Sequence, residues 1–409
     1  MPGYVHRAVL AWSMIKGMGT GLYLAGSMVF FTRYVGLRPS YVGVGLSAAL
    51  TTGLLAQVPC GMAADRFGGR IAWLAGSAAE AAAFFLYPLV RSFPAFAAVA
   101  IIEAVGMAQA SAGKWRYLGD LFPDGSRAAG RGYLRSANNA GMALGTVLAG
   151  VPLAIGGRAA YLVVFLGIAA ATTAGCGLVA WAVPRFPVRR QSRDERRRKG
   201  RSALRDPMFV AATVLSGVVS LNGPLLSVIF PLWLLKRTDA PPVLISASLL
   251  LNMVLVIAFQ PAAGRSAEDL AGAGRAQRLA AAALAAASVA FAVSAVTRGA
   301  PTVAVLVTAV VVLTASEVFS DAAVSGIGYN LAPAERRGEY LSVISLGGSL
   351  SWAVAPAGLT ALVIGAGPVG WAVAAGLFSG VGALTRPVLS RAEQARVNAP
   401  ETVGSEGVA

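Results

Sequence analysis

The feature that most constrains this fold is a succession of long apolar runs along the whole chain. A helix crosses the hydrocarbon core of a bilayer in about 20 residues, because each residue adds about 1.5 Å to its length. The runs therefore predict twelve membrane-crossing helices. They cover approximately residues 9–31, 41–63, 70–90, 94–113, 132–154, 159–183, 208–235, 242–263, 277–297, 301–322, 339–362 and 366–386.

The composition agrees with an integral membrane protein. Of the 409 residues, 56% are hydrophobic and only 13% are charged, whereas soluble domains average about 25% charged residues. The runs are continuous rather than alternating, which disfavours a transmembrane β-barrel. The expected fold class is all-α, with every span a helix.

The formal net charge of +16 is explained by membrane topology. With the N-terminus inside, most of the 34 Lys and Arg residues fall on the cytoplasmic side, which predicts that both termini are cytoplasmic. The most basic segment, which contains Arg196-Arg197-Arg198-Lys199, is interpreted as a topology anchor and linker. Binding to anionic lipid headgroups or to nucleic acid is its alternative reading. The excess of Arg over Lys, with abundant Ala and Gly, is typical of a high-GC bacterial genome and indicates a bacterial plasma membrane.

A loop motif with the sequence GMAADRFGGR follows the second apolar run. Gly61 lets two helices approach closely, and Gly68 permits a tight turn. Asp65, Arg66 and Arg70 add charge at the cytoplasmic surface. A simple solvated turn is the alternative interpretation.

A weaker copy of this motif begins at Gln260, half a chain later, with Glu268 in place of the acid. A second internal similarity pairs Tyr133-Leu134 with Tyr340-Leu341, each at the start of an apolar run. These two similarities between the halves of the chain predict two parallel repeats. The expected organisation is an N-terminal six-helix half at 1–183, a basic cytoplasmic linker at 184–207, a C-terminal six-helix half at 208–390 and a cytoplasmic tail at 391–409.

The loop motif and the repeat resemble the major facilitator superfamily of secondary transporters. The resemblance implies twelve helices in two six-helix halves, with helices 1, 4, 7 and 10 around a central cavity. It also implies that Asp65 holds the inner end of helix 11, near Gly338–Tyr340, in the outward-facing state and releases it on inward opening. A carboxylate is favoured there by the helix dipole.

Helix 5 is similar in part to the Gly- and Pro-rich helix 5 of drug:proton antiporters, which adds a resemblance to that group. It contains Gly141 and Gly145, although Thr146 stands where that motif has Pro, and Pro152 comes later. Tight helix packing is the alternative role for these glycines.

Charged residues inside the predicted helices are candidates for mechanism, because such groups are costly in hydrocarbon unless they face a cavity or a partner. Glu103 in helix 4 is the first candidate for proton coupling, since burial near the midplane favours its neutral form. Lys16 in helix 1 is within reach of it, so an ion pair between the two is the alternative. Glu80 in helix 3 is interpreted as a structural residue paired with a neighbour.

Helix 10 supplies two further candidates for proton coupling, Glu317 and Asp321, which lie one turn apart. Asp321 is the repeat counterpart of Lys114, at the inner end of helix 4, which suggests a contact between them at an inner gate. Lys16 and Lys114 are accordingly treated as charge partners.

Four residues are expected to line a substrate cavity: Asn138, Asn222, Asn252 and Trp352. Pro224, close to Asn222, removes a backbone hydrogen bond and predicts a hinge in helix 7. The surroundings are mostly apolar. Such a cavity suits an amphipathic or cationic compound better than a sugar, whose hydroxyls need many polar partners.

The sequence therefore predicts a monomeric, proton-coupled exporter of small hydrophobic compounds that works by alternating access. A proton-coupled importer of an organic anion or nutrient is the alternative, because Lys16, Lys114 or Arg116 could bind an anion. An enzyme is disfavoured, since no nucleophile and base, phosphate loop or metal cluster is recognisable. The expected partners are a small-molecule substrate, protons and membrane lipids, with no nucleic acid, cofactor or metal.

Overall fold

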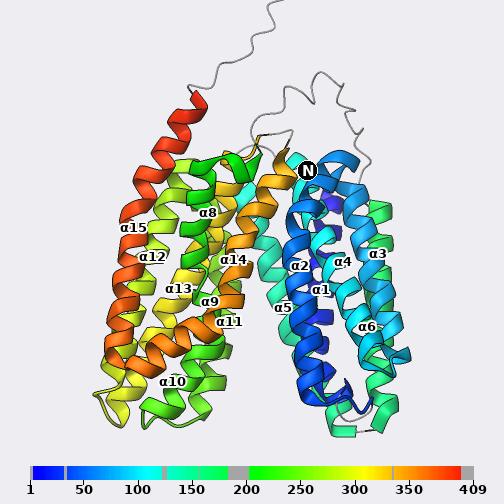
Figure 1. Cartoon of the computed structure of the whole chain (residues 1–409), viewed down its shortest axis with the longest axis horizontal. Helices are drawn as coiled ribbons and strands as arrows, with labels where there is room; N and C mark the ends of the chain where they lie inside the picture. Colours follow the sequence, from blue (N-terminus) through cyan, green and yellow to red (C-terminus); the bar gives the residue numbers. More distant parts are fainter. Residues whose placement is uncertain are drawn as a thin grey trace, which may run out of the picture.

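The computed structural model describes residues 3–31, 35–121, 127–155, 157–182, 202–333 and 336–397, and its regular structure there is helical. Figure 1 shows the helices in two groups that lie side by side, close together at one end and apart at the other. We call α1–α6 the first group and α8–α15 the second group. The predicted linker lies outside the described residues up to 201, and the predicted tail does so from 398 onward.

The first group contains the helices that precede the predicted linker. Gly68, with a φ of 91°, makes the turn between its second and third helices, as the loop motif predicted. The elements are α1 (Gly3–Val29), α2 (Pro39–Phe67), α3 (Gly69–Leu86), η2 (Tyr87–Leu89), α4 (Phe93–Leu121), α5 (Arg127–Ile155) and α6 (Gly157–Ala182).

The second group begins after a short 3-10 turn, η3 (Ala203–Arg205). Asp206 caps α8 by accepting a hydrogen bond from Phe209 N at 3.1 Å, and Asp269 caps α12 through Gly272 N at 2.7 Å. The elements are α8 (Pro207–Val219), α9 (Asn222–Pro224), η4 (Leu225–Ile229), α10 (Phe230–Arg237), α11 (Val243–Ser266), α12 (Leu270–Ser294), α13 (Ala300–Leu331), α14 (Arg337–Leu359), η6 (Thr360–Gly365) and α15 (Pro368–Val397).

The predicted runs all fall on helical segments, and nine helical stretches of the described residues are long and apolar enough to cross a membrane. The total of twelve crossings stays a prediction. The seventh run is divided at Asn222–Pro224 and continues through the π-helical turn η4, where the sequence predicted a hinge. Helix α15 continues to Val397, beyond the predicted start of the tail, because Ala, Glu, Gln and Arg in that stretch favour helix.

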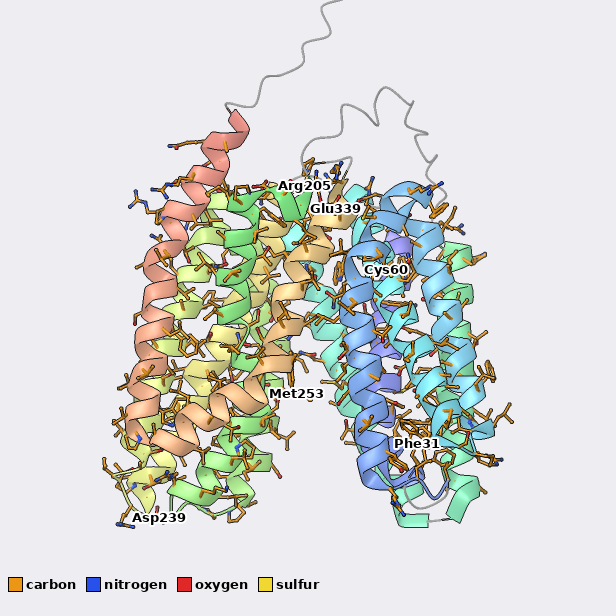
Figure 2. The ribbon with its side chains drawn as sticks, viewed as in Figure 1. Phe31, Cys60, Arg205, Asp239, Met253 and Glu339 are labelled. Carbon is orange, nitrogen blue, oxygen red and sulfur yellow. The ribbon has the colours of Figure 1, made fainter. Side chains whose placement is uncertain are left out.

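Each group has an aromatic core of its own. Phe31, Tyr87 and Phe165 pack together in the first group, and Figure 2 places Phe31 at the end where the groups are apart. Trp233 and Trp371 meet edge to face in the second group, with ring centroids 5.6 Å apart. Separate cores favour movement of each group as a unit.

Helices α1 and α5 pack with their backbones in contact. A Cβ at Gly141 would overlap the carbonyl of Met14, and one at Gly145 would overlap the carbonyl of Met18. Small residues allow this approach, and in lipid the close packing itself drives the association of helices.

Gly141→Val is therefore expected to prevent this packing and to lower the free energy of unfolding by about 3 kcal/mol or more. Gly177→Val on α6 is the matched control, because a Cβ there has no atom within 4 Å. Denaturant unfolding of the purified variants in detergent measures the difference. Equal unfolding midpoints for the two variants would show that the contact is not needed.

Candidate functional site

The end of α2 is held directly against the start of α14, which joins the two groups. Asp65 Oδ1 accepts a hydrogen bond from Gly338 N at 2.8 Å, and Oδ2 accepts one from Glu339 N at 2.9 Å. Arg116 of α4 pairs with the same carboxylate at 2.9 Å. The placement of Asp65 at this helix N-terminus is confirmed, and it is favourable because the helix dipole attracts a carboxylate.

The other residues of the loop motif lie at the same end of the first group. A Cβ at Gly61 would overlap Ser342 Oγ and crowd Gly338 O, so Gly61 allows α2 and α14 to approach. Arg66 lies over the ring of Phe67, and Arg70 donates to Ala180 O at 2.6 Å. These two arginines therefore contact the first group itself.

A second connection between the groups is an ion cluster. Arg135 of α5 donates through Nη2 to Glu317 Oε1 at 2.9 Å, and its Nε lies 2.8 Å from Asp321 Oδ2. Asn252 Nδ2 of α11 donates to Glu317 Oε2 at 2.9 Å and to Thr314 Oγ1 at 3.1 Å. The cluster is partly exposed, at 41%, 16% and 29% for Arg135, Glu317 and Asp321.

Further hydrogen bonds between the groups join α2 and α4 to α13 and α14, and α5 to α11. Figure 2 shows Glu339, at the start of α14, at the end where the groups are close, and Asp239 at the opposite end. Within the described residues, the two groups of helices are thus bridged at one end. The further bonds are Gln57 Nε2 to Ser349 Oγ at 2.6 Å, Tyr329 OH to Trp115 O at 3.2 Å, Arg337 Nη1 to Gly119 O at 2.9 Å, Ser136 Oγ to Ile257 O at 3.2 Å and Arg265 Nη1 to Tyr133 OH at 3.0 Å.

Glu80 and Glu103 have their bonded partners inside the first group. Lys16 Nζ donates to Glu80 Oε2, so Lys16 pairs with Glu80 rather than with Glu103. Glu103 accepts a hydrogen bond from Tyr87 OH at 3.2 Å, and Tyr87 OH also lies 3.3 Å from Tyr23 OH. The sequence could not choose between the two acids, because the choice depends on how α1, α3 and α4 rotate against one another.

The suggested contact between Lys114 and Asp321 is wrong. Lys114 Nζ lies over the rings of Trp12 and Trp115, at 4.9 and 4.2 Å from their centroids, and Arg135 is the partner of Asp321. The aromatic faces stabilise the ammonium group without a carboxylate.

The residues predicted to line a cavity are dispersed. Asn138 Nδ2 donates to Ser13 O at 3.3 Å in the α1–α5 contact, and Asn252 belongs to the ion cluster. Asn222 is buried at the break between α8 and α10, with its Nδ2 lacking a hydrogen bond. Trp352 alone among the four lines the cavity described next.

A cavity of about 540 Å³ lies between α2, α4 and α14. Its volume is in the usual range for small-molecule sites. Its lining is mostly apolar, with polar side chains contributed by Thr51, Gln57, Ser111, Ser342, Ser345 and Ser349. None of its described lining residues is acidic or basic. The lining residues are Leu50, Thr51, Gly53, Leu54, Gln57, Ala104, Met107, Ala108, Ser111, Ala112, Trp115, Leu341, Ser342, Ser345, Ser349, Trp352 and Ala353.

Sequence reasoning missed Arg135, Gln57 and Tyr87. Arg135 lies inside the predicted run 132–154, so an unexplained charge in an apolar run was an available signal. Gln57 likewise lies inside the run 41–63. Tyr87 carries no comparable signal, because its hydroxyl becomes relevant only when α4 brings Glu103 beside it.

Two groups of apolar helices, bridged at one end by charged and polar side chains, define a multi-pass membrane protein with a division between two bundles. A family model described as Major Facilitator Superfamily matches residues 9–356. The chain therefore belongs to the major facilitator superfamily. It is a membrane transporter, a secondary carrier rather than an enzyme.

Solved structures of very different carriers share this fold. The human organic anion transporter MFSD10 is 15% identical, with a TM-score of 0.68, 95% of this chain covered and 100% of the other. A bacterial homologue of the iron transporter ferroportin, in an outward-facing state, is 14% identical, with a TM-score of 0.73 and coverages of 95% and 99%. The proton:xylose symporter XylE is 16% identical, with a TM-score of 0.71 and coverages of 98% and 96%. No curated protein sequence matches the chain.

Proposed function

We propose that this carrier is a proton-coupled exporter of small hydrophobic or amphipathic compounds, such as drugs or natural products. It would act as a monomer in a bacterial plasma membrane, with both termini cytoplasmic. The two groups of helices would rock against each other and open a shared site to either side in turn. In this proposal the bridged end is cytoplasmic, and the described conformation faces outward.

The observation that carries the proposal is the bridge from Arg135 to Glu317 and Asp321. Inward opening would separate α5 from α13 and leave two carboxylates one turn apart without the guanidinium between them. Two like charges this close together favour binding of a proton to one of them. Proton binding at Glu317 or Asp321 would thus accompany opening of this end, which is the link that coupling requires.

The loop motif is proposed as the switch that opposes this opening. Asp65 accepts two backbone hydrogen bonds from the first turn of α14, and both must be lost when α2 and α14 separate. Gly61 and Gly68 provide the close approach and the turn that place the carboxylate there. Arg66 and Arg70 are proposed to fix the loop on the first group.

Glu103 is proposed as the proton site of the first group. It is held by Tyr87 rather than by an ion pair, so its charge is not matched by a bonded cation. Lys16, bound to Glu80, contributes positive charge nearby. A proton could therefore be exchanged at Glu103 without first breaking a salt bridge.

The substrate class is inferred from the cavity between α2, α4 and α14. Its described lining offers no cation to an organic anion, although MFSD10 is described as an organic anion transporter. It offers few hydrogen-bonding groups to a sugar, although XylE is described as a xylose symporter. Apolar compounds suit such a lining. Asn222 and Asn252 would lie next to the path of such a compound only after a conformational change.

The test is reconstitution of the purified carrier in liposomes that contain a pH-sensitive dye. Lipophilic cations, neutral aromatic compounds and organic anions are added in turn under an imposed proton gradient. We expect proton movement opposite to the movement of a hydrophobic compound. Proton movement in the same direction as an organic anion or a nutrient would support the importer instead.

Glu103→Gln is expected to reduce proton movement coupled to substrate by at least about a hundredfold, because the amide cannot exchange a proton. Glu393→Gln on the exposed end of α15 is the matched control and should behave as the unaltered protein. Both variants are compared in the same liposome assay at equal protein content. Undiminished coupled transport by Glu103→Gln would remove this residue from the proposal.

A further inference from the structure

The side chain of Trp352 connects the cavity with the break between α8 and α10. Trp352, on α14, lines the cavity. Its indole ring also lies directly against Gly223, since a Cβ placed there would be 3.1 Å from Cζ2 and 3.4 Å from Cε2 and Nε1. Gly223 is the middle residue of α9, between Asn222 and Pro224. One ring therefore contacts both the space for a ligand and the point where the helix is interrupted.

The helix is weakly held at this point. Pro224 has no backbone N–H to donate, and the next five residues, Leu225–Ile229, form a π-helical turn. The side-chain nitrogen of Asn222 is buried and has no hydrogen-bond partner among the described residues. A stretch with missing hydrogen bonds bends at a lower cost than a continuous helix does.

Bending at α9 would move the helical segment that follows it. That segment is α10, and Figure 2 places Asp239, just beyond its end, where the two groups are apart. Phe230 of α10 and Leu359 of α14 are buried in the same apolar core, so these parts of the two helices would move together. A bend would also move Gly223, the surface on which Trp352 lies.

The position of the cavity gives this movement a direction. Its walls come from α2 and α4 of the first group and from α14 of the second group. A ligand between them gains contacts when α14 and α10 move toward the first group. Because a ligand shifts an equilibrium toward the conformation that it binds more tightly, occupancy of the cavity favours closure of the end where the groups are apart.

We propose that Trp352 couples occupancy of the cavity to the bend at α9, and that its contact with Gly223 limits the size of the ligand. A bound ligand contacts the ring, and the ring transmits its position to Gly223. The proposal rests on this cavity being the substrate site of the proposed exporter. Trp352 is then the residue that determines specificity, and Gly223 is the residue that positions it.

The first test is the equilibrium binding of two neutral dyes that fluoresce more strongly in apolar surroundings, measured without a proton gradient. N-phenyl-1-naphthylamine is the smaller dye and Nile red is the larger one. Gly223→Ala places a methyl group nearer to the ring than the usual separation of about 3.5–4.0 Å, so the ring must shift away from α9 and narrow the cavity. We expect the binding of Nile red to weaken at least about fivefold and that of the smaller dye less than about twofold.

Three further variants separate the ring from other causes. Gly376→Ala on α15 is the matched control, because a Cβ there has no atom within 4 Å. In a Trp352→Ala background, Gly223→Ala should have no further effect on Nile red, because the ring that the methyl group displaces is gone. Trp352 is 52% exposed, so its truncation leaves the buried core intact. Ala353→Phe, at an exposed lining position, should weaken both dyes by filling the cavity.

The second test measures the coupling as a distance between the groups. Spin labels replace the exposed residues Lys236 on α10 and Val44 on α2, in a background where Cys60 and Cys176 are alanine. Saturating Nile red should shorten the distance between the labels. In Trp352→Ala, saturated with the same dye, the distance should stay unchanged.

Shortening of equal size in Trp352→Ala would overturn the proposal, as would a full effect of Gly223→Ala in the absence of the Trp352 ring. Absence of saturable binding, or binding unaffected by Ala353→Phe, would overturn it too. None of these results depends on protons. Ligand-induced shortening without proton movement in liposomes would reject the exporter and keep the coupling, whereas proton movement without shortening would do the reverse.

Discussion

Asp65→Ala is expected to shift the carrier away from the conformation in Figure 1 and to abolish most of its transport. The substitution removes two hydrogen bonds to the first turn of α14 and the pairing with Arg116. Hydrogen bonds to a charged group contribute about 1.5–3 kcal/mol each. A loss of about 3 kcal/mol would lower the population of the bridged state relative to the open one by roughly a hundredfold.

Spin labels on α2 and α14 near the bridged end would measure this shift as a longer distance between the two helices. Asp269→Ala is the matched control. Asp269 also accepts a backbone hydrogen bond at a helix N-terminus, but α12 and its cap belong to one group. The variant Asp269→Ala should lower the free energy of unfolding without changing the distance between the two groups of helices. An unchanged distance distribution in Asp65→Ala would contradict the switch role of this loop.

Arg135→Glu is expected to lower coupled transport by at least about a hundredfold, because it places a third carboxylate beside Glu317 and Asp321. Repulsion would separate α5 from α13 and favour opening of the bridged end. The partial exposure of the cluster weakens this repulsion, since nearby water screens the charges. The effect should nevertheless exceed that of neutralisation by Arg135→Gln.

The double variant Arg135→Glu with Glu317→Arg tests whether the pair itself matters. Restored attraction between α5 and α13 should recover a substantial part of transport, and the coupling appears as non-additivity of the two changes. Arg391→Glu, at an exposed position on α15, is the control for charge reversal alone. Equal losses in the single and double variants would show that Arg135 acts through some other contact.

The sequence predicted only part of the candidate site. Asp65 was placed correctly because the resemblance of its loop motif to the major facilitator superfamily implied which helix end it meets. Asn138 was expected in a cavity and instead bonds Ser13 O in the α1–α5 contact. Lys114 was expected beside Asp321 and instead stacks on tryptophans. Such errors arise because the sequence gives the position of a residue along a helix but not the direction in which it points.

The sequence by itself determined the helical class, because a bilayer core requires long apolar helices. It also determined the place of the charged loop, because that loop follows the second apolar run. Only the tertiary structure decided the partners of each charge. Whether Lys16 meets Glu80 or Glu103, and whether Arg135 reaches Asp321, depends on helix rotation and on the close approach that glycines such as Gly61 and Gly141 permit. Those contacts form between residues far apart in the chain, so packing in three dimensions selects them.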